Sequence, residues 1–427
     1  MPAVISKPTV DDLPAELLSM VLSSAHISDV QSNAIAAKFR FTLASVCRKW
    51  RAITCSSASI WSDLTITLDT DSAYLALIFD RSKSAPLSIM LHLNPYNYSC
   101  GRIPGTTYIE GGLTVHNLCA VTLPMIKAQA PRIAELRMRC GSQLLLDEVL
   151  AVLKPLDGQA LKVLDLEVPL VMFRELCWHP ADSSRIMSLF GGESAIRELR
   201  LVSLPLINAG LQFTAVTHLN LDGVPWPLSW SSFVRNLSAM SNLQALGLAG
   251  IVCSDYDLDT PTPLPMVTDL HITITTAGCD YPLKLLLFPS LSTCRLWLVI
   301  GDLPSVVEAL TDALANIQHL ELFDHGNNTS LTDVLSHTSN LESLDLSRVD
   351  LDVYRKVVRL LKSNQLVLNF LKHVDIGGFL NCEAETTNFL WGTTASLTMP
   401  CLDDVSSKEL WSMGKDGRFE CRKFISL

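Results

Sequence analysis

The side chains that could do chemistry are spread along the chain rather than gathered in one motif. Ten histidines and twelve cysteines are present. None falls in a glycine-rich phosphate loop, a His-Glu-x-x-His helix, a Gly-x-Ser-x-Gly elbow or a Cys-x-x-Cys pair. Three histidines, His218, His319 and His373, share one phase of the repeat described below, but they lie two or more strands apart. Neighbouring strands are about 4.8 Å apart, so these rings are too distant to hold one metal. We therefore expect no catalytic residue, no metal and no cofactor.

Two other sets of side chains are suited to binding and pairing. Arg137, Asp165 and Arg200 alternate in sign at one phase of the repeat, which predicts ion pairs across neighbouring strands. Aromatic residues beside an arginine are typical of protein-binding hot spots. Trp297 and Phe323 fall at the same phase of adjacent repeats, beside Arg295 and Glu321, and these four residues form a candidate target-binding set. The alternative is that a loop or the C-terminal tail covers these aromatic rings.

A repeated pattern must position these residues. The pattern apolar-x-x-apolar-x-apolar occurs ten times from Ile133 onward, with start-to-start spacings of 20 to 35 residues. Most spacings lie in the range of roughly 20 to 29 residues that leucine-rich repeats show. Helical patterns lie between the strands: 143–153, 229–240, 303–314, 330–338 and 351–362. The sequence thus predicts an α/β fold, a curved solenoid of parallel strands on the concave face and helices on the convex face.

The phase of each repeat predicts which way its side chains point. The first, fourth and sixth positions should face inward, and the third, fifth and seventh should line the open face. The asparagine or cysteine that usually follows the strand is missing from all ten repeats. The turns must therefore satisfy their backbone groups in another way.

The N-terminal region has helical rather than repeat character. A first apolar stripe runs from Leu13 to Ala25, with Pro14 where the first helical turn needs no N–H and Glu16 where the helix dipole favours an anion. A second stripe runs from Phe39 to Ile53 and includes Val46, Cys47 and Trp50. Two such helices are too small to bury both faces against each other and also hide Trp50 and Trp61. We expect some apolar surface to remain for a partner.

The order Leu13-Pro14-x-Glu16-Leu17-Leu18, then Val46-Cys47-Arg48-Lys49-Trp50-Arg51-x-Ile53, then Ile60-Trp61 resembles an F-box of the divergent, fungal type. The segment from Ser23 to Arg40 is longer and more polar than this family needs, so we expect a loop insertion there. The resemblance implies docking onto the small adaptor of cullin-RING ubiquitin ligases. The implied docking residues are Leu13, Pro14, Leu17, Leu18, Val21, Val46, Cys47, Trp50 and Trp61. The alternative is that residues 11–61 only cap the end of the repeat domain.

Composition and the remaining segments complete the domain prediction. The chain has 427 residues, 48% hydrophobic and 18% charged, with a net charge of −10, which argues against nucleic acid as the main partner. We expect a disordered tail at 1–10, the F-box at 11–62, and a junction of strands, helix and loop at 63–132. The solenoid follows at 133–380 and a C-terminal cap at 381–427. The most apolar run, Leu283 to Ile300, is interrupted by charge and proline and predicts no membrane span. Scattered cysteines without a signal peptide favour a reducing compartment, cytosol or nucleus.

Together these features predict a substrate-receptor subunit of an SCF-type ubiquitin ligase. Its F-box would bind the adaptor and, through it, a cullin, while the solenoid would hold an unknown target protein. A second hypothesis is a non-ligase scaffold that uses the repeats to organise other proteins. A third, an enzyme with an unrecognised site on the open face, would need a clustered acid, base or nucleophile there.

Overall fold

The structure is a computed structural model in which the chain forms two compact units. The first unit comprises Met1–Leu204 and Leu211–Val216, and the second comprises Pro205–Gly210 and Thr217–Leu427. The structure describes residues 13–30, 36–93, 116–154, 160–168, 195–204, 213–223, 228–250, 253–255, 261–274, 283, 285–298, 303–324, 331–349, 370–371, 373–375 and 425–426. The predicted tail at 1–10, residues 94–115 of the predicted junction and the helix at 351–362 lie outside these ranges.

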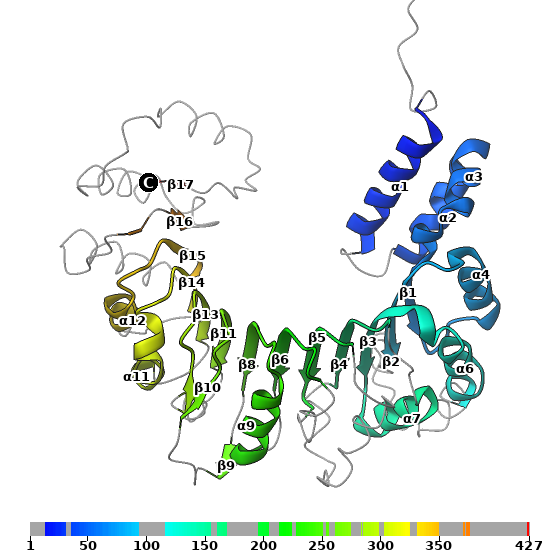
Figure 1. Cartoon of the computed structure of the whole chain (residues 1–427). Helices are drawn as coiled ribbons and strands as arrows, with labels where there is room; N and C mark the ends of the chain where they lie inside the picture. The colour runs from blue at the N-terminus through cyan, green and yellow to red at the C-terminus, as the bar shows by residue number, and fades with distance from the viewer. Residues whose placement is uncertain are drawn as a thin grey trace, which may run out of the picture. The chain divides into compact units, whose positions relative to one another are not determined.

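The first unit opens with three helices, where the sequence predicted two (Figure 1). These are α1 (Ala15–Val30), α2 (Ala36–Val46) and α3 (Arg48–Ser56), followed by the 3₁₀ helix η2 (Ala58–Trp61). Most of the segment Ser23–Arg40, in which a loop insertion was predicted, is helical, because α1 continues to Val30 and α2 begins at Ala36. Only residues 31–35 of that segment lie outside the description.

The sheet of the first unit begins earlier than predicted. Strand β1 (Asp63–Thr67) pairs in parallel with β2 (Leu87–Leu93), and β2 pairs in parallel with β3 (Ile133–Cys140). The region expected to be a junction therefore contains the first two strands of the sheet itself. The remaining elements of this unit are α4 (Ser72–Ser82), the π-helix η4 (Leu118–Thr122), α6 (Leu123–Lys127), η5 (Ala130–Arg132), α7 (Gln143–Leu153), β4 (Val163–Glu167) and β5 (Glu198–Val202).

The second unit continues the same alternation of strand and return segment. Its main strands run in the order β6, β8, β11, β13, β14, β15 and β16, all parallel, and β17 pairs antiparallel with β16. These strands are β6 (His218–Asp222), β8 (Ala245–Ala249), β11 (Asp269–Ile274), β13 (Thr293–Leu298), β14 (His319–Asp324), β15 (Ser343–Val349), β16 (His373–Asp375) and β17 (Ile425–Ser426).

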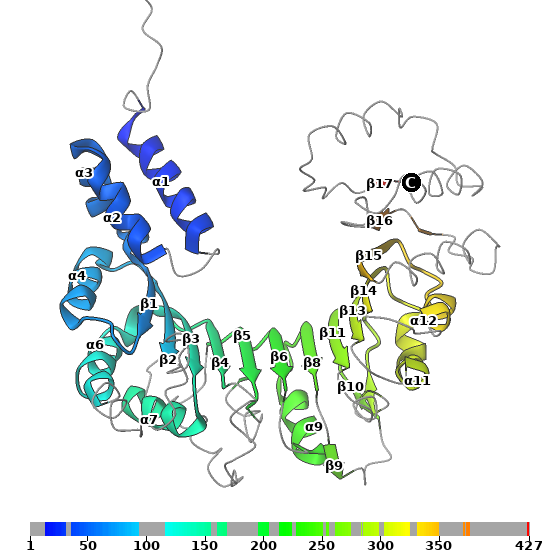
Figure 2. The same cartoon turned by 180° about the vertical axis from the view of Figure 1, so that it is seen from behind.

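Helices and short strands fill the returns of the second unit. Figure 2 shows α9 beside β6 and β8, and α11 and α12 beside the later strands. The bounds are α9 (Trp230–Ala239), α11 (Leu303–Leu314) and α12 (Leu331–His337), with two short pairs formed by β7 (Leu228–Ser229) and β9 (Cys253–Asp255), and by β10 (Thr262–Pro263) and β12 (Leu286–Leu287).

The phase predicted for the repeats is confirmed. A strand lies at each of the ten pattern sites, and the described first, fourth and sixth positions are at most 6% exposed. In the repeat that contains β4, for example, Leu161, Leu164 and Leu166 are 2%, 0% and 0% exposed. Alternation of this kind buries one side of each strand and leaves the other open. The solenoid itself, as a leucine-rich-repeat array with a concave strand face, stays a prediction.

Backbone hydrogen bonds replace the missing asparagine ladder at the turns. After the strands, the N–H of Gly223 donates to the carbonyl of Ala249 at 2.8 Å, and that of Gly250 donates to Thr273 at 3.3 Å. Both glycines have φ near +60°, a conformation that costs other residues roughly 1–2 kcal/mol. Ser203, at the same phase, also has a positive φ of 59°. These turns reach the neighbouring repeat through main-chain atoms rather than through asparagine side chains.

Candidate protein-interaction surfaces

Trp61 is the centre of the N-terminal helical module. Its side chain is 0% exposed, and its Nε1–H donates to the carbonyl oxygen of Thr54 at 2.7 Å. The ring of Phe41 meets it edge-on with centroids 5.8 Å apart, and the Arg81 guanidinium lies 4.6 Å from the ring centroid. Because this indole joins α2, α3, η2 and α4, we infer that it holds the module together rather than contacting a partner.

Arg40 is buried next to this indole, which is unusual for a charged side chain. It is 1% exposed, lies 5.7 Å from the Trp61 ring centroid and donates through Nη2 to the carbonyl of Asp63 at 2.7 Å. Burial lowers the pKa of Arg40, with weaker opposing effects from Tyr74 and Asp63. Its Nε and Nη1 atoms have no hydrogen-bond partner among the described residues. The cation–π contact and the Asp63 bond offset part of its desolvation.

Cys47 separates α2 from α3, where the sequence predicted one continuous stripe. Its backbone is extended (φ −155°, ψ 174°), and its Sγ accepts a hydrogen bond from the N–H of Trp50 at 3.5 Å, so it serves as the N-cap of α3. Lys49, in the first turn of α3, donates to the carbonyl of Leu13 at 2.9 Å. This bond ties α3 to Leu13, two residues before the start of α1, and fixes the approach of the two helices.

The predicted docking residues fall into three groups. Leu17, Val21 and Val46 are 49%, 54% and 56% exposed, and Pro14 is also exposed. Leu13, Cys47 and Trp50 are half-buried. Leu18 and Trp61 are 0% exposed. Leu18 was predicted on the docking edge and Trp61 at or just beneath it, and side chains buried in this way can only support a docking surface from beneath.

Sequence reasoning missed Met20, which is 67% exposed on α1. Leu17, Met20 and Val21 lie three and four residues apart and therefore on one side of the helix; we call them the α1 apolar face. The available signal was the helical spacing itself, since Leu18 and Leu22 occupy the buried side at 0% and 2% exposure. Three large exposed apolar side chains together are typical of a protein-binding surface.

Comparison with known proteins agrees with this geometry. Residues 10–67 match the F-box-like family model, which extends slightly beyond the predicted bounds of 11–62. The search of curated proteins found no match to the chain. The chain thus carries an F-box-like domain at its N-terminal end, a domain class that generally binds the adaptor subunit of SCF-type ligases.

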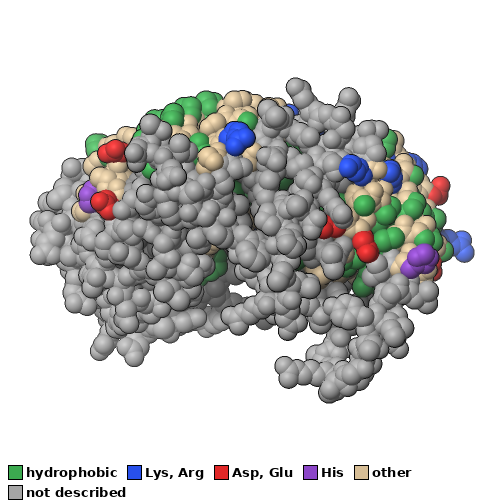
Figure 3. Space-filling model, turned by 90° about the horizontal axis from the view of Figure 1, so that it is seen from below, with side chains coloured by type: hydrophobic (Ala, Val, Ile, Leu, Met, Phe, Trp, Pro, Cys, Tyr) green, Lys and Arg blue, Asp and Glu red, His purple; other side chains and the backbone are tan. Residues whose placement is uncertain are grey.

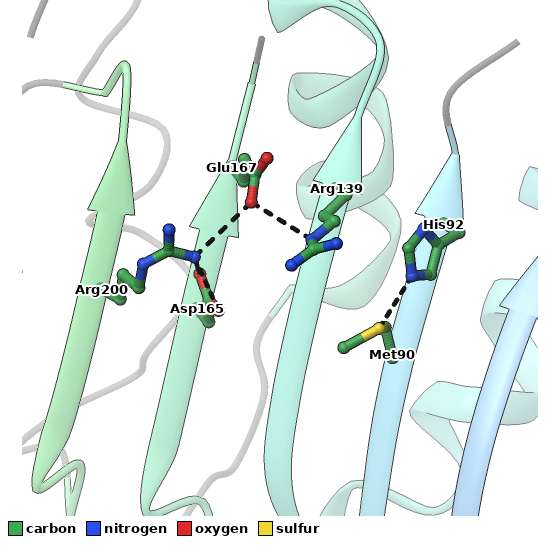
Figure 4. Close-up of polar contacts among 6 residues, drawn as sticks. All are labelled: Met90, His92, Arg139, Asp165, Glu167 and Arg200. Atoms are coloured by element: carbon green, nitrogen blue, oxygen red, sulfur yellow. Dashed lines mark hydrogen bonds and ion pairs between the residues drawn. The ribbon is translucent and has the colours of Figure 1, made fainter. Parts of the chain in front are cut away.

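The open face of the first unit carries a network of ion pairs (Figure 4). Arg200 Nη1 lies 3.2 Å from both carboxylate oxygens of Asp165 and 3.5 Å from Glu167 Oε2, which also lies 3.2 Å from Arg139 Nε. The predicted pair of Arg200 with Asp165 is confirmed. Arg137, predicted to pair with Asp165, instead contacts Glu135 of its own strand at 3.1 Å. Acids and arginines on this face thus largely compensate each other.

The open face of the second unit holds the predicted target-binding set. Trp297 and Phe323 face each other in adjacent strands, with ring centroids 4.4 Å apart, and both are half-buried rather than fully exposed. Arg295 Nε contacts Glu321 at 3.2 Å, and Arg295 Nη2 lies 3.9 Å from Asp269. The rings pack against each other at an interplanar angle of 42°, and this contact accounts for part of their burial. The structure brings all four predicted residues together on β13 and β14.

The predicted spacing of the histidines is confirmed by the strand register. His319 and His373 are separated by β15, and His218 lies several strands away on β6. Among the described residues, no group of three or more histidine, cysteine or carboxylate side chains could hold a metal ion. The helices of the described ranges include none that is long and apolar enough to cross a membrane. On the described surface in Figure 3, basic and acidic side chains lie in small interspersed groups.

Proposed function

We propose that this chain is a substrate-recognition subunit of an SCF-type ubiquitin ligase. The F-box-like match at residues 10–67 carries the proposal. On this account the α1 apolar face contacts the ligase adaptor, which in turn recruits a cullin, and the repeat sheet holds a target protein. The chain itself performs no covalent chemistry. It raises the effective concentration of target lysines near the activated ubiquitin by tethering. Its place of action would be the cytosol or nucleus.

The solenoid interpretation of the sheet belongs to the same proposal. Parallel strands at successive repeats, each followed by a return segment, suit a leucine-rich-repeat array that extends from β1 rather than from Ile133. The second candidate function is a non-ligase scaffold. The open sheet faces of the two units suit a scaffold as well as they suit a receptor. A measurement of adaptor binding is therefore needed to distinguish the two functions.

The test is direct binding of the full chain to the purified ligase adaptor. The variant Leu17→Ala, Met20→Ala, Val21→Ala removes the α1 apolar face without touching the buried Leu18. Truncating hot-spot side chains typically costs more than about 1 kcal/mol each, so we expect the affinity to fall at least about tenfold.

A matched control removes exposed apolar side chains from the second unit. Met266 and Leu287 are 50% and 43% exposed, and the variant Met266→Ala, Leu287→Ala should bind the adaptor as the unaltered chain does. If the unaltered chain fails to bind, residues 11–61 only cap the sheet. If the α1 variant binds as tightly as the control variant, the adaptor does not contact the α1 apolar face.

A further inference from the structure

Arg40 of α2 is the only buried arginine or lysine in the part of the chain that the structure describes. Its side chain is 1% exposed, and its Nη2 donates to the main-chain carbonyl oxygen of Asp63 at 2.7 Å. Arg40 belongs to the helical module formed by α1, α2, α3 and η2, whereas Asp63 is the first residue of β1. This bond therefore joins the module directly to the sheet of the first unit.

The Asp63 carbonyl lies on the outer edge of the sheet. Among the described strands, β1 has β2 as its one neighbour. The carbonyl of Ser62 accepts a hydrogen bond from the N–H of Ser88 on β2 at 3.0 Å, so the next carbonyl, that of Asp63, points away from β2. On that side, Arg40 supplies the donor that a neighbouring strand would otherwise supply.

The other end of the same edge is also closed by the chain itself. Thr67, the last residue of β1, donates its N–H to Thr70 Oγ1 at 2.8 Å, and its carbonyl accepts the N–H of Thr70 at 3.1 Å. Unpaired strand edges are prone to pair with other chains, so both closures protect β1. Thr70 belongs to the turn after the strand, whereas Arg40 attaches a helix of the module.

Arg40 also contacts the residue that ends the module. Trp61 closes η2, and its ring centroid lies 5.7 Å from the Arg40 guanidinium carbon. Arg40 therefore holds the chain on both sides of the junction, at Trp61 before it and at Asp63 after it. A second bridge runs from Arg81 Nη1 of α4 to Cys55 Sγ of α3 at 2.7 Å. Sulfur is a weak acceptor, and this bridge reaches a helix rather than a strand.

Stability alone does not explain why an arginine is buried here. Its Nε and Nη1 have no hydrogen-bond partner among the described residues, and burial lowers the pKa of Arg40. A methionine could fill this position without that desolvation cost. Apolar packing has no preferred direction, whereas a hydrogen bond is directional. Buried polar groups are retained in some proteins because they select one arrangement of the packed elements.

We propose that Arg40 is a positioning residue, which fixes the direction of the helical module relative to the first strands of the sheet. Helix α1 shares this joint, because Ser19 Oγ lies 3.0 Å from the Oγ of Ser57, the N-cap residue of η2. A partner that binds the α1 apolar face is therefore held at one angle to the open face of the first unit. This inference goes beyond the proposed function, since it holds for a receptor and for a scaffold alike.

Double electron–electron resonance on the full chain measures this angle as a distribution of distances. The twelve cysteines prevent site-specific labelling through thiols. A ketone-bearing amino acid is therefore introduced at Ala25 on α1 and at Ala151 on α7, two exposed positions of the first unit, and each takes a nitroxide label. The width of the distribution reports how far the module swings relative to the sheet.

The variant Arg40→Met keeps an unbranched side chain but removes every donor. We expect the distribution to widen about twofold or more, because only apolar packing then orients the module. Asp63 is half-buried, so water can bind its freed carbonyl and the fold should persist. The variant Arg40→Lys retains a charged donor and should restore most of the narrow distribution.

Arg51→Met is the matched control. Arg51 Nε also donates to a main-chain carbonyl, that of Ala44, at 2.8 Å, but this bond stays inside the module, between α3 and α2. The control should therefore leave the distribution as narrow as in the unaltered chain. Equal widening in Arg40→Met and Arg51→Met would show a general loss of order in the module and would overturn the proposal.

Circular dichroism and thermal unfolding of each variant separate direction from stability. A folded Arg40→Met chain that keeps the narrow distribution overturns the proposal. An Arg40→Met chain that no longer folds overturns it as well, because the role of Arg40 would then be stability. The adaptor is absent from this measurement, so a chain that fails to bind the adaptor contradicts the ligase function and leaves the role of Arg40 unaffected.

Discussion

Replacing Trp61 tests whether the N-terminal module is organised around one indole. Burying an aromatic side chain of roughly 150–250 Å² at about 25 cal/mol per Å² contributes about 4–6 kcal/mol. The hydrogen bond to Thr54 adds about 1 kcal/mol, and the Arg81 contact adds about 0.5–1 kcal/mol. Relaxation of the cavity offsets part of this sum. We expect Trp61→Ala to lower the free energy of unfolding of the module by about 3–5 kcal/mol.

A second substitution separates the ring from its N–H group. Trp61→Phe keeps an aromatic ring against Phe41 but leaves the Thr54 carbonyl without its donor, so we expect a loss of about 1–2 kcal/mol. Trp50→Ala is the matched control, because Trp50 is only half-buried in the same module.

Hydrogen exchange measured by mass spectrometry on α3 and β1 reports the local free energy of opening and does not depend on tryptophan fluorescence. A loss below about 1 kcal/mol for Trp61→Ala, or one no larger than that of Trp50→Ala, would refute a central role for the indole.

Three further predictions concern the sheets. Burial raises the pKa of Cys140 and of Cys294 to about 12. Both thiols should therefore resist iodoacetamide at pH 8 in the folded chain and react after unfolding, and labelling of the native chain would contradict this. The folded state should also lose stability as the pH rises above the ordinary thiol pKa of about 8.5, because the thiols ionise more readily in the unfolded chain. A Cβ at Gly247 would lie 2.9 Å from Asn220 Oδ1, so Gly247→Ala should cost about 1 kcal/mol in thermal unfolding. The cost should vanish in an Asn220→Ala background, and an unchanged cost there would point to the backbone instead. Arg200→Met should cost less than about 1 kcal/mol, and the cost should shrink at high salt, because its guanidinium is partly solvated; denaturant titrations at two ionic strengths test this.

The strands and the core could be predicted because the repeat fixes both period and phase. The fourth position of the pattern, which Leu164 holds in its repeat, faces inward. No other register of the strands would bury the row of side chains at this position. The early start of the sheet was missed although a signal existed. Trp61-x-x-Leu64-x-Ile66 fits the repeat pattern, with tryptophan where the later repeats have an aliphatic residue. Trp61 thus belongs both to the helical module and to the first strand unit.

The helical module was predicted less well, for local reasons. Cysteine is not a common N-cap, so the break at Cys47 had no clear sequence signal. Leu17 and Leu18 are adjacent and alike in type, and only the helix geometry shows that Leu17 is exposed while Leu18 is buried. Much of the segment expected to hold a loop before Arg40 is helix, since polar residues on an exposed helix side resemble a loop in sequence.

The open-face residues were placed correctly, and the pair of Arg200 with Asp165 was predicted, but the partner of Arg137 was not. Trp297 and Phe323 were expected in adjacent strands and lie there. The tilted contact between their rings and the contact of Arg137 with Glu135 depend on side-chain rotamers, which a pattern of residue types does not encode.

The central claim is that the chain couples a target protein to a ubiquitin ligase, and target turnover tests it most directly. The full chain and the variant Leu17→Ala, Met20→Ala, Val21→Ala are expressed as affinity-tagged proteins in cells, and co-purifying proteins and their half-lives are measured by quantitative mass spectrometry. We predict that a cullin co-purifies only with the unaltered chain. Proteins captured by both forms should be longer-lived in cells with the variant. Captured proteins whose half-lives are the same in both cells, without a cullin in either sample, would contradict the receptor function and leave a scaffold.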